Sequence, residues 1–303
     1  MRPDLNLLVI LDALCRLGSV SQAAEAVSLS QPAISHALNR LRAATGDPLF
    51  TRAGRGLVPT PRALALAREV AAIVAAGQAC LRPETFDPAR DAPRFRLGIS
   101  DYAGLTLLPG IVAAVAAEAP LAVVEALPVG PGVLRQLEEG VLDLSFWGTA
   151  PPPAPYLYRR LFEESFVLAL RRGHPAIGPG EKPPPPDVFP GLSHAVVSLG
   201  DPGKSPVDQA LARAGMSRKV VLSSPSFAAN LAAVAGSDLV ATIPARLVRG
   251  LPAGLVALPL PVSVPDFAYG MIWHPRSDAS AALRWLRGLI ERVTAASGDQ
   301  ALP

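Results

Sequence analysis

Polar side chains that can contact nucleic acid recur at helical spacing between residues 31 and 42. The apolar residues Ile34, Ala37, Leu38 and Leu41 follow the period of one helix and should face a core. The outer face then carries hydroxyl, amide, imidazole and guanidinium groups, which are groups that read base edges or contact phosphates. Together with one serine of the preceding helix, the predicted DNA contacts are Ser21, Gln31, Pro32, Ser35, His36, Asn39 and Arg40.

Two short helices joined by a tight turn must position these groups. Ser21 is predicted to cap the first of them, and Ala23 and Ala24 let the second approach closely. Ser30 is predicted to cap the second helix, with Pro32 tolerated in its first turn. This order is typical of a helix-turn-helix.

A basic hairpin over residues 50–58 should follow as a wing, and its Arg52 and Arg55 are predicted to reach phosphates or the minor groove. Residues 1–82 hold nine Arg and five Asp or Glu, a net charge of +4, whereas the rest of the chain has a net charge of −1. The positive charge therefore belongs to the predicted DNA-binding end, where it supplies affinity for phosphates of any sequence.

The same segment resembles the DNA-binding domain of LysR-type transcriptional regulators. The similarity covers nearly all 303 residues, and the chain is most similar to the branch that governs nodulation and aromatic-degradation genes. It implies a regulator that binds double-stranded DNA and a small-molecule effector as a homodimer or homotetramer, with RNA polymerase as a further partner if the protein is an activator. The matching residues are Ala23-Ala24, Ser30 to Ser35, Leu38, Leu41, Asp47 to Phe50, Arg52 and Pro59-Thr60-Pro61.

A long helix is predicted from Pro61 to about residue 82, with Thr60 as its cap. One helix alone cannot bury both of its apolar lines, so we interpret it as a linker helix for dimerisation; the alternative is packing on its own domain. The first line is Leu64, Ala67, Ala71, Val74, Gln78 and Leu81, and the second is Leu66, Val70, Ile73 and Gly77.

Beyond a Pro- and Asp-rich segment at residues 83–93, which we expect to be a hinge, strand and helix periods alternate. The βαβαβ order of residues 94–147 indicates a parallel sheet, and a similar alternation follows over residues 195–260. The expected fold class is α/β: an N-terminal winged helix-turn-helix, a linker helix and, as the resemblance implies, a two-lobed effector-binding domain like a periplasmic binding protein. The expected boundaries are 1–60, 61–82, 83–93 and 94–303, with lobe 1 at about 94–163 and 266–303 and lobe 2 at about 164–265.

Ligands in such sheets lie beyond the carboxyl ends of the strands, which places the predicted effector site between the lobes. We expect a helix to begin near Thr106, where free N–H groups would favour a carboxylate, helped by Lys204. Asp101 would repel such an anion unless it is paired. The predicted effector contacts are Ser100, Asp101, Tyr102, Thr106, Ser145, Trp147, Ser198, Lys204 and Phe227.

Enzymatic chemistry has no support in the sequence. Gly203-Lys204-Ser205 resembles the end of a P-loop, but Ser198 stands where the first glycine is needed, and the four histidines lack metal-ligand spacing. We therefore predict no enzyme, cofactor or metal. Two rival interpretations stay open, a small-molecule carrier with a degenerate DNA-binding domain and an α/β enzyme with a regulatory head.

Composition favours a globular protein, since half the residues are hydrophobic and 17% are charged. The N-terminal residues lack a signal-peptide pattern, and no run reaches the ~18 uninterrupted apolar residues of a membrane span. We expect a cytoplasmic protein with no membrane partner. Cys15 and Cys80 have no pairing pattern and should be reduced thiols.

Overall fold

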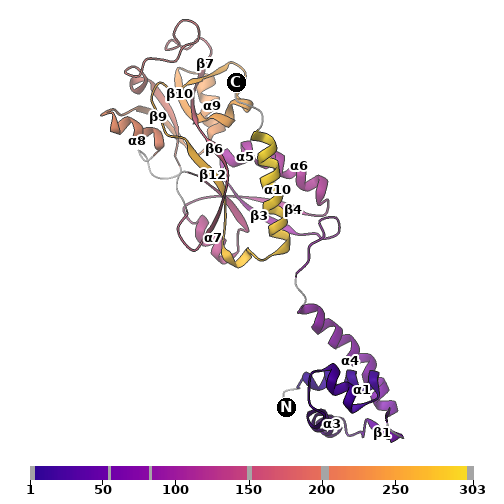
Figure 1. Cartoon of the computed structure of the whole chain (residues 1–303). Helices are drawn as coiled ribbons and strands as arrows, with labels where there is room; N and C mark the ends of the chain where they lie inside the picture. The colour runs from indigo at the N-terminus through magenta and orange to yellow at the C-terminus, as the bar shows by residue number, and fades with distance from the viewer. Residues whose placement is uncertain (1–3, 54–55, 82–83, 149–151, 199–204, 299–303) are drawn as a thin grey trace. The chain divides into compact units, whose positions relative to one another are not determined.

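A computed structural model of the chain describes residues 4–53, 56–81, 84–148, 152–198 and 205–298 (Figure 1). The chain divides into two compact units, Met1–Pro83 and Glu84–Pro303. Each unit has its own apolar core.

The first unit has the predicted order of elements, in which three helices precede a hairpin and a long helix. Apolar faces of these elements meet in one core, where Leu14, Ile34 and Leu49 are fully buried. The elements are α1 (Asn6–Leu17), α2 (Val20–Ala26), α3 (Gln31–Thr45), β1 (Phe50–Ala53), β2 (Gly56–Pro59) and α4 (Pro61–Cys80).

Side-chain caps set where the short helices begin. Ser30 caps α3 as predicted and accepts a hydrogen bond from the N–H of Ala33 at 3.3 Å. Ser21, in contrast, does not cap α2: Ser19 is the cap and accepts from the N–H of Gln22 at 3.4 Å. Because α2 begins two residues earlier than expected, Ser21 lies inside its first turn, where it is exposed.

Helix α4 packs one side against its own unit. Val70 is buried there, and Leu66 and Val74 are half-buried against the same core. Leu64, Ala71, Ile73 and Leu81 remain exposed on other sides of the helix. Within the described residues, α4 is also the one helix with the length and apolar composition of a membrane span, which is weak evidence because core helices of soluble proteins have the same composition.

In the second unit, lobe 1 is built on a mixed five-stranded sheet with the order β4-β3-β5-β12-β6. β3 is parallel to both β4 and β5, whereas β12 runs antiparallel to both β5 and β6. The strands are β3 (Arg94–Ile99), β4 (Val123–Pro128), β5 (Leu144–Gly148), β6 (Leu157–Glu164) and β12 (Phe267–Trp273). The helices are α5 (Asp101–Thr106), α6 (Leu108–Glu118), α7 (Val133–Glu139), the 3₁₀ turn η3 (Pro275–Ser277) and α10 (Ala281–Gly298).

Lobe 2 repeats this plan with the order β11-β7-β10-β8-β9, in which β10, β8 and β9 are parallel and β7 is antiparallel to both of its neighbours. The parallel sheet predicted for residues 94–147 is confirmed by β3, β4 and β5. The other strands of each lobe add antiparallel pairs, so both sheets are mixed. The strands are β7 (Phe166–Arg171), β8 (Ser193–Val197), β9 (Lys219–Ser224), β10 (Leu239–Pro244) and β11 (Leu255–Pro259). The helices are η1 (Phe189–Gly191), α8 (Pro206–Arg213), α9 (Phe227–Ala235) and η2 (Ala245–Gly250).

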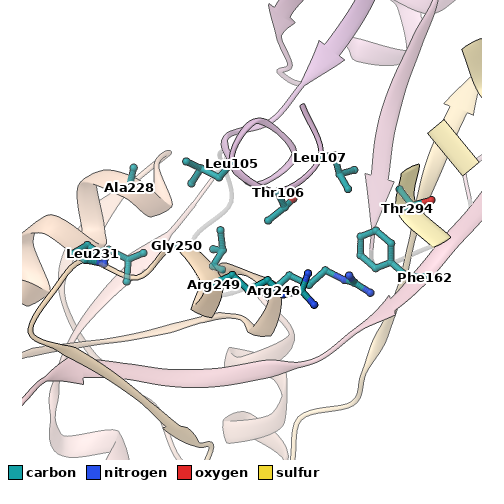
Figure 2. Close-up of a pocket in the computed structure, with 12 residues that line it drawn as sticks. Leu105, Thr106, Leu107, Phe162, Ala228, Leu231, Arg246, Arg249, Gly250 and Thr294 are labelled. Carbon is teal, nitrogen blue, oxygen red and sulfur yellow. The ribbon is translucent and has the colours of Figure 1, made fainter. Parts of the chain in front are cut away.

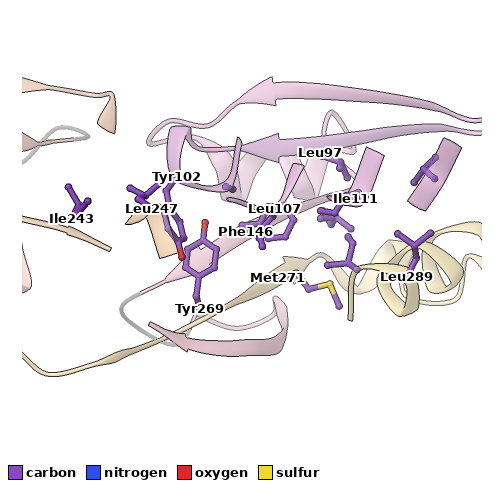
Figure 3. Packing of buried hydrophobic residues seen from close by; sticks show 14 of the residues in the cluster. Leu97, Tyr102, Leu107, Ile111, Phe146, Ile243, Leu247, Tyr269, Met271 and Leu289 are labelled. Carbon is purple, nitrogen blue, oxygen red and sulfur yellow. The ribbon is translucent and has the colours of Figure 1, made fainter. Parts of the chain in front are cut away.

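The chain crosses between the two sheets twice, once between β6 and β7 and once between β11 and β12. One apolar cluster continues across the junction, from Met271 and Leu289 of lobe 1 to Ile243 and Leu247 of lobe 2 (Figure 3). The lobes are thus packed against each other as well as joined by the two crossings.

The segment after residue 83, which we expected to be a hinge, packs on α10. The ring of Phe86 lies 5.3 Å from that of Trp285, and the Ser280 hydroxyl is 3.4 Å from a carboxylate oxygen of Glu84. Residues from Glu84 onward are therefore part of the second unit.

Candidate DNA-binding and effector sites

The outer face of α3 is polar and exposed. Buried residues on the opposite side hold the helix against the core and leave this face to solvent. All six predicted residues of α3 lie on this face: Gln31, Pro32, Ser35, His36, Asn39 and Arg40.

Two arginines of α3 have partners within the first unit. Arg40 forms an ion pair with Asp4 at 2.9 Å. Arg42, which the sequence reasoning missed, donates from Nε to the Pro48 carbonyl at 2.8 Å and from Nη1 to the Asn39 side chain at 3.4 Å. Arg42 therefore fastens α3 to the chain that enters the wing, and its spacing of three residues from Asn39 was the available signal.

The wing is a two-stranded antiparallel hairpin in which Arg52 pairs in register with Leu57. Arg52 is exposed, and Arg55 lies outside the described residues. The Asp47 carboxylate accepts the N–H of Leu49 at 2.7 Å and the hydroxyl of Thr60 at 2.8 Å. This carboxylate joins the start of the wing to the residue that caps α4.

Asp101 connects the lobes. Its carboxylate accepts the backbone N–H of Phe227 and, at 3.2 Å, the hydroxyl of Ser226, so it lies at the N-terminus of α9 in lobe 2. A carboxylate is stabilised by the free N–H groups and partial positive charge of a helix N-terminus. Asp101 is therefore paired, so it meets the condition under which it would not repel a carboxylate ligand.

Three predicted effector residues have different surroundings from those we expected. Helix α5 ends at Thr106 instead of beginning there, because Ser100 caps it and accepts the N–H of Ala103 at 3.3 Å. The hydroxyl of Thr106 donates to the carbonyl of Tyr102 at 2.7 Å. Ser145 is fully buried and donates to the carbonyl of Gly98 at 3.0 Å, so it stabilises the sheet.

The other predicted effector residues lie on both lobes. Trp147, on β5, packs against a small apolar cluster that includes Val133 and Leu137. Ser198 follows β8, and its N–H donates to the carbonyl of Ser224 at 3.0 Å. Phe227 opens α9 as predicted, with its ring edge-on to Tyr102 at 6.3 Å. Lys204 lies outside the described residues.

A buried polar group lies at the first crossing between the lobes. Glu164, at the end of β6, accepts hydrogen bonds from the Tyr102 hydroxyl and, at 3.0 Å, from the N–H of Ser165. Burial is the main cause that raises the pKa of the Glu164 carboxyl, and it also raises the pKa of the Tyr102 phenol. Arg246 of η2 faces this carboxylate, with Nε 3.6 Å from Oε2.

A cavity of about 390 Å³ lies between the lobes beside Arg246 (Figure 2). Of the predicted effector residues that the structure describes, Thr106 alone lines this cavity. Arg246 follows the carboxyl end of β10, so the strand-end rule applied to every strand was the signal that would have found it. The described lining residues are Leu105, Thr106, Leu107, Phe162, Ala228, Leu231, Arg246, Leu247, Arg249, Gly250, Pro252 and Thr294.

A winged helix-turn-helix joined to a two-lobed α/β domain defines a class of DNA-binding regulators with a domain for small molecules. Residues 5–64 match the family model of the bacterial regulatory helix-turn-helix protein, lysR family, and residues 88–295 match that of the LysR substrate binding domain. The chain belongs to the LysR family of transcriptional regulators. Members of this family are regulators, which decides against the enzyme interpretation.

Individual relatives agree with this assignment. The chain is 36% identical to the HTH-type transcriptional activator NagR of Ralstonia sp. over 290 residues, 94% of this chain and 95% of the relative. It is 33% identical to Nodulation protein D 1 of Sinorhizobium fredii over 292 residues, 94% of this chain and 88% of the relative. A crystal structure of a probable transcriptional regulator from Pseudomonas aeruginosa is 29% identical, with a TM-score of 0.62, over 95% of this chain and 96% of that one. The resemblance to the aromatic-degradation and nodulation branch is confirmed.

Proposed function

We propose that this regulator changes its operator binding, or the geometry of bound DNA, when a small aromatic or other carboxylate binds between its two lobes. The observation that carries the effector part is the contact between Asp101 of lobe 1 and the N-terminus of α9 in lobe 2. A ligand that binds at this contact would favour one orientation of the two lobes over another. A ligand can switch a protein between two conformations only if it binds one of them more tightly.

The DNA part of the proposal rests on the exposed face of α3. Gln31 and Ser35 would contact base edges, Pro32 would contact a thymine methyl, and His36 a base or a phosphate. Ser21, Asn39, Arg40, Arg52 and Arg55 would supply further contacts, mainly to phosphates.

Operator binding by variants of α3 tests this assignment. Gln31→Ala and Ser35→Ala should each weaken binding to the operator by about 1–3 kcal/mol and leave binding to scrambled DNA nearly unchanged. Asp187→Ala, an exposed substitution in lobe 2, is the control. Equal losses on both DNAs would refute base reading, and a wild-type protein without DNA affinity would favour the small-molecule carrier.

The effector part is tested by calorimetry with a panel of aromatic and aliphatic acids and their amides. Ser100→Ala and Phe227→Ala should weaken the acid that binds, because both residues lie where α5 and α9 meet. The same acid should change the operator footprint of the wild-type protein. An acid that binds equally well to both variants would place the effector elsewhere.

Association is part of the same proposal. The exposed apolar side of α4 would join two subunits into a homodimer, which could pair into a homotetramer. The protein would act in the cytoplasm, and RNA polymerase would be a further partner if it activates transcription.

A further inference from the structure

We propose that a further cavity, on the lobe 2 side of the two crossings, binds a small primary amine with an apolar body. Its volume of about 460 Å³ is within the range of sites that enclose small molecules. Ala245 and Val248 of η2 line this cavity, and neither of them lines the cavity beside Arg246. Because a 3₁₀ helix repeats every three residues, these two side chains share one side of η2. The crossing cavity, as we call it, is therefore a separate site.

The two crossings between the lobes run side by side at this cavity. Glu164, at the end of β6, pairs in register with Phe267, at the start of β12. The ring of Phe166, directly after the first crossing, has its centre 5.1 Å from that of Phe267. Ser165 and Phe166 line the cavity from the first crossing, and Asp266 lines it from the second. A ligand in the crossing cavity would thus contact both crossings at once.

The charge of the crossing cavity favours a cation. Asp266 is the one charged residue among the described residues that line it. Asp266 is exposed, and its carboxylate forms no ion pair or hydrogen bond with the described residues. An ammonium group would therefore meet an opposite charge that no other residue of the described chain shares.

Two neighbours add to this attraction, which at an exposed carboxylate is weak by itself. Phe166 is half-buried in the cavity wall, and an ammonium group is attracted to the face of an aromatic ring. The N–H of Ser165 donates to Glu164 at 3.0 Å, and its carbonyl accepts the N–H of Ala245 at 2.9 Å. The Ser165 hydroxyl has no partner among the described residues, so it can accept one of the three N–H bonds of an ammonium group.

The remaining walls suit an apolar body. They are formed by side chains of β7, β11 and the segment that follows β11: Val167, Leu258, Leu260, Val262 and Val264. An alcohol with the same apolar body could cover these walls equally well, but it would lack the charge that Asp266 and Phe166 attract. The site should therefore prefer an amine to the matched alcohol.

Direct binding to the full-length protein tests the site, with 2-phenylethylamine, cyclohexylmethylamine and hexylamine as probes and the matched alcohols as neutral counterparts. At least one amine should bind saturably at millimolar concentration. Its alcohol should bind at least about fivefold more weakly, as the loss of an ion pair and a cation–π contact implies. Three amines without saturable binding, or an amine and alcohol of equal affinity, would overturn the proposal.

Substitutions locate the bound amine. Asp266→Asn should weaken the amine at least about threefold and leave its alcohol unchanged, because it removes the charge and keeps the shape. Asp187→Asn removes another exposed aspartate of lobe 2, outside the cavity lining, and is the charge-matched control. Val248→Trp should abolish binding of both compounds, because it enlarges a half-buried side chain that lines the cavity.

Thermal unfolding of each variant separates a lost site from a lost fold. Asp266 is exposed, so its variant should keep wild-type stability and decides the question even if Val248→Trp unfolds. Undiminished binding of the amine to either folded variant would overturn the location, and an equal loss in Asp187→Asn would reveal a general effect of charge and overturn the role of Asp266. The probe's binding is measured without DNA and without an acid, so its failure would leave the operator and effector proposals standing.

Discussion

At the scale of single residues, Asp101 shows how a side chain can serve both lobes. It is in the first turn of α5, and its carboxylate receives the N–H of Phe227 from α9. A carboxylate with backbone donors of a helix N-terminus is a charge-assisted cap, and its loss leaves those donors without a partner.

We therefore predict that Asp101→Ala lowers the free energy of unfolding of residues 84–303 by about 1 to 3 kcal/mol. Urea unfolding of wild type and variant measures the difference. Asp187→Ala removes an exposed aspartate elsewhere in lobe 2 and is the control. Equal losses from the two substitutions would mean that the contact between α5 and α9 contributes little.

His194, on β8, should make the stability of lobe 2 depend on pH. It is fully buried, and its Nε2 is 2.9 Å from the carbonyl oxygen of Phe189. Burial lowers the pKa of His194 to about 4. A depressed pKa means that the folded state resists protonation, so this contribution to stability is present above the ordinary pKa of histidine and is lost as the pH falls toward 4.

Between pH 7 and pH 5 the wild-type protein should lose about 2 kcal/mol more stability than His194→Gln does. Urea unfolding at the two pH values checks this difference. His36→Gln, which removes an exposed histidine of α3, should behave like wild type. A loss that is the same in all three proteins would exclude His194 as its source.

Predictions from sequence succeeded where helical periodicity determines which face of a helix is exposed. They failed where a single hydrogen bond determines which residue caps a helix. The exposed face of α3 follows from its apolar spacing, and Ser30 is the one serine directly before that helix. Before α2, however, Ser19 and Ser21 are both suitable caps, and only the folded turn distinguishes them. The partner of Asp101 is more than a hundred residues away along the chain, which no local pattern reveals.

At the scale of elements, α4 has two distinct sides. Val70 is 3% exposed within the first unit, whereas Leu64 is 52% exposed and Ile73 is 53% exposed. An apolar side of this kind, left open by the unit to which it belongs, favours a protein interface. The sequence predicted both apolar lines but not which residues of each line face the helix's own unit.

Glutamate at Leu64 and Ala71 should therefore produce monomers by sedimentation while the first unit stays folded. Val74 is unsuitable for such a test, because that residue is half-buried in its own unit. Val70→Ala is the contrasting variant: it should lower the free energy of unfolding of the first unit by about 1 to 3 kcal/mol and leave association intact. If the protein with both glutamates still forms dimers, α4 packs only within its own subunit and does not hold the subunits together.

The order of elements in each lobe was predictable, because helical and strand periods differ clearly. The antiparallel strands were not, since β12 takes its place between β5 and β6 only after the chain has passed through lobe 2. Sheet order of this kind depends on contacts distant in sequence, and local periodicity carries no information about them.

At the scale of the whole molecule, the two units have separate cores, so each should fold without the other. A fragment of residues 84–303 should unfold cooperatively and bind the same acids as the full chain. A fragment of residues 94–303 should be less stable, because it loses the contacts of Phe86 with Trp285 and of Glu84 with Ser280. Circular dichroism during heating compares the two, and equal stabilities would show that residues 84–93 contribute nothing.

The position of β12 also sets the order in which the lobes mature during translation. All five strands of lobe 2 lie within residues 166–259, so that sheet is complete before β12 leaves the ribosome. Lobe 1 must wait, since β12 is the strand that joins β6 to the rest of its sheet. Domains fold as units when their chain becomes available, and apolar strands that wait for a distant partner are exposed to aggregation. We therefore expect lobe 1 to depend on chaperones during synthesis more than lobe 2 does, and premature stops after residue 260 should release proteins with a finished second lobe and an open first one.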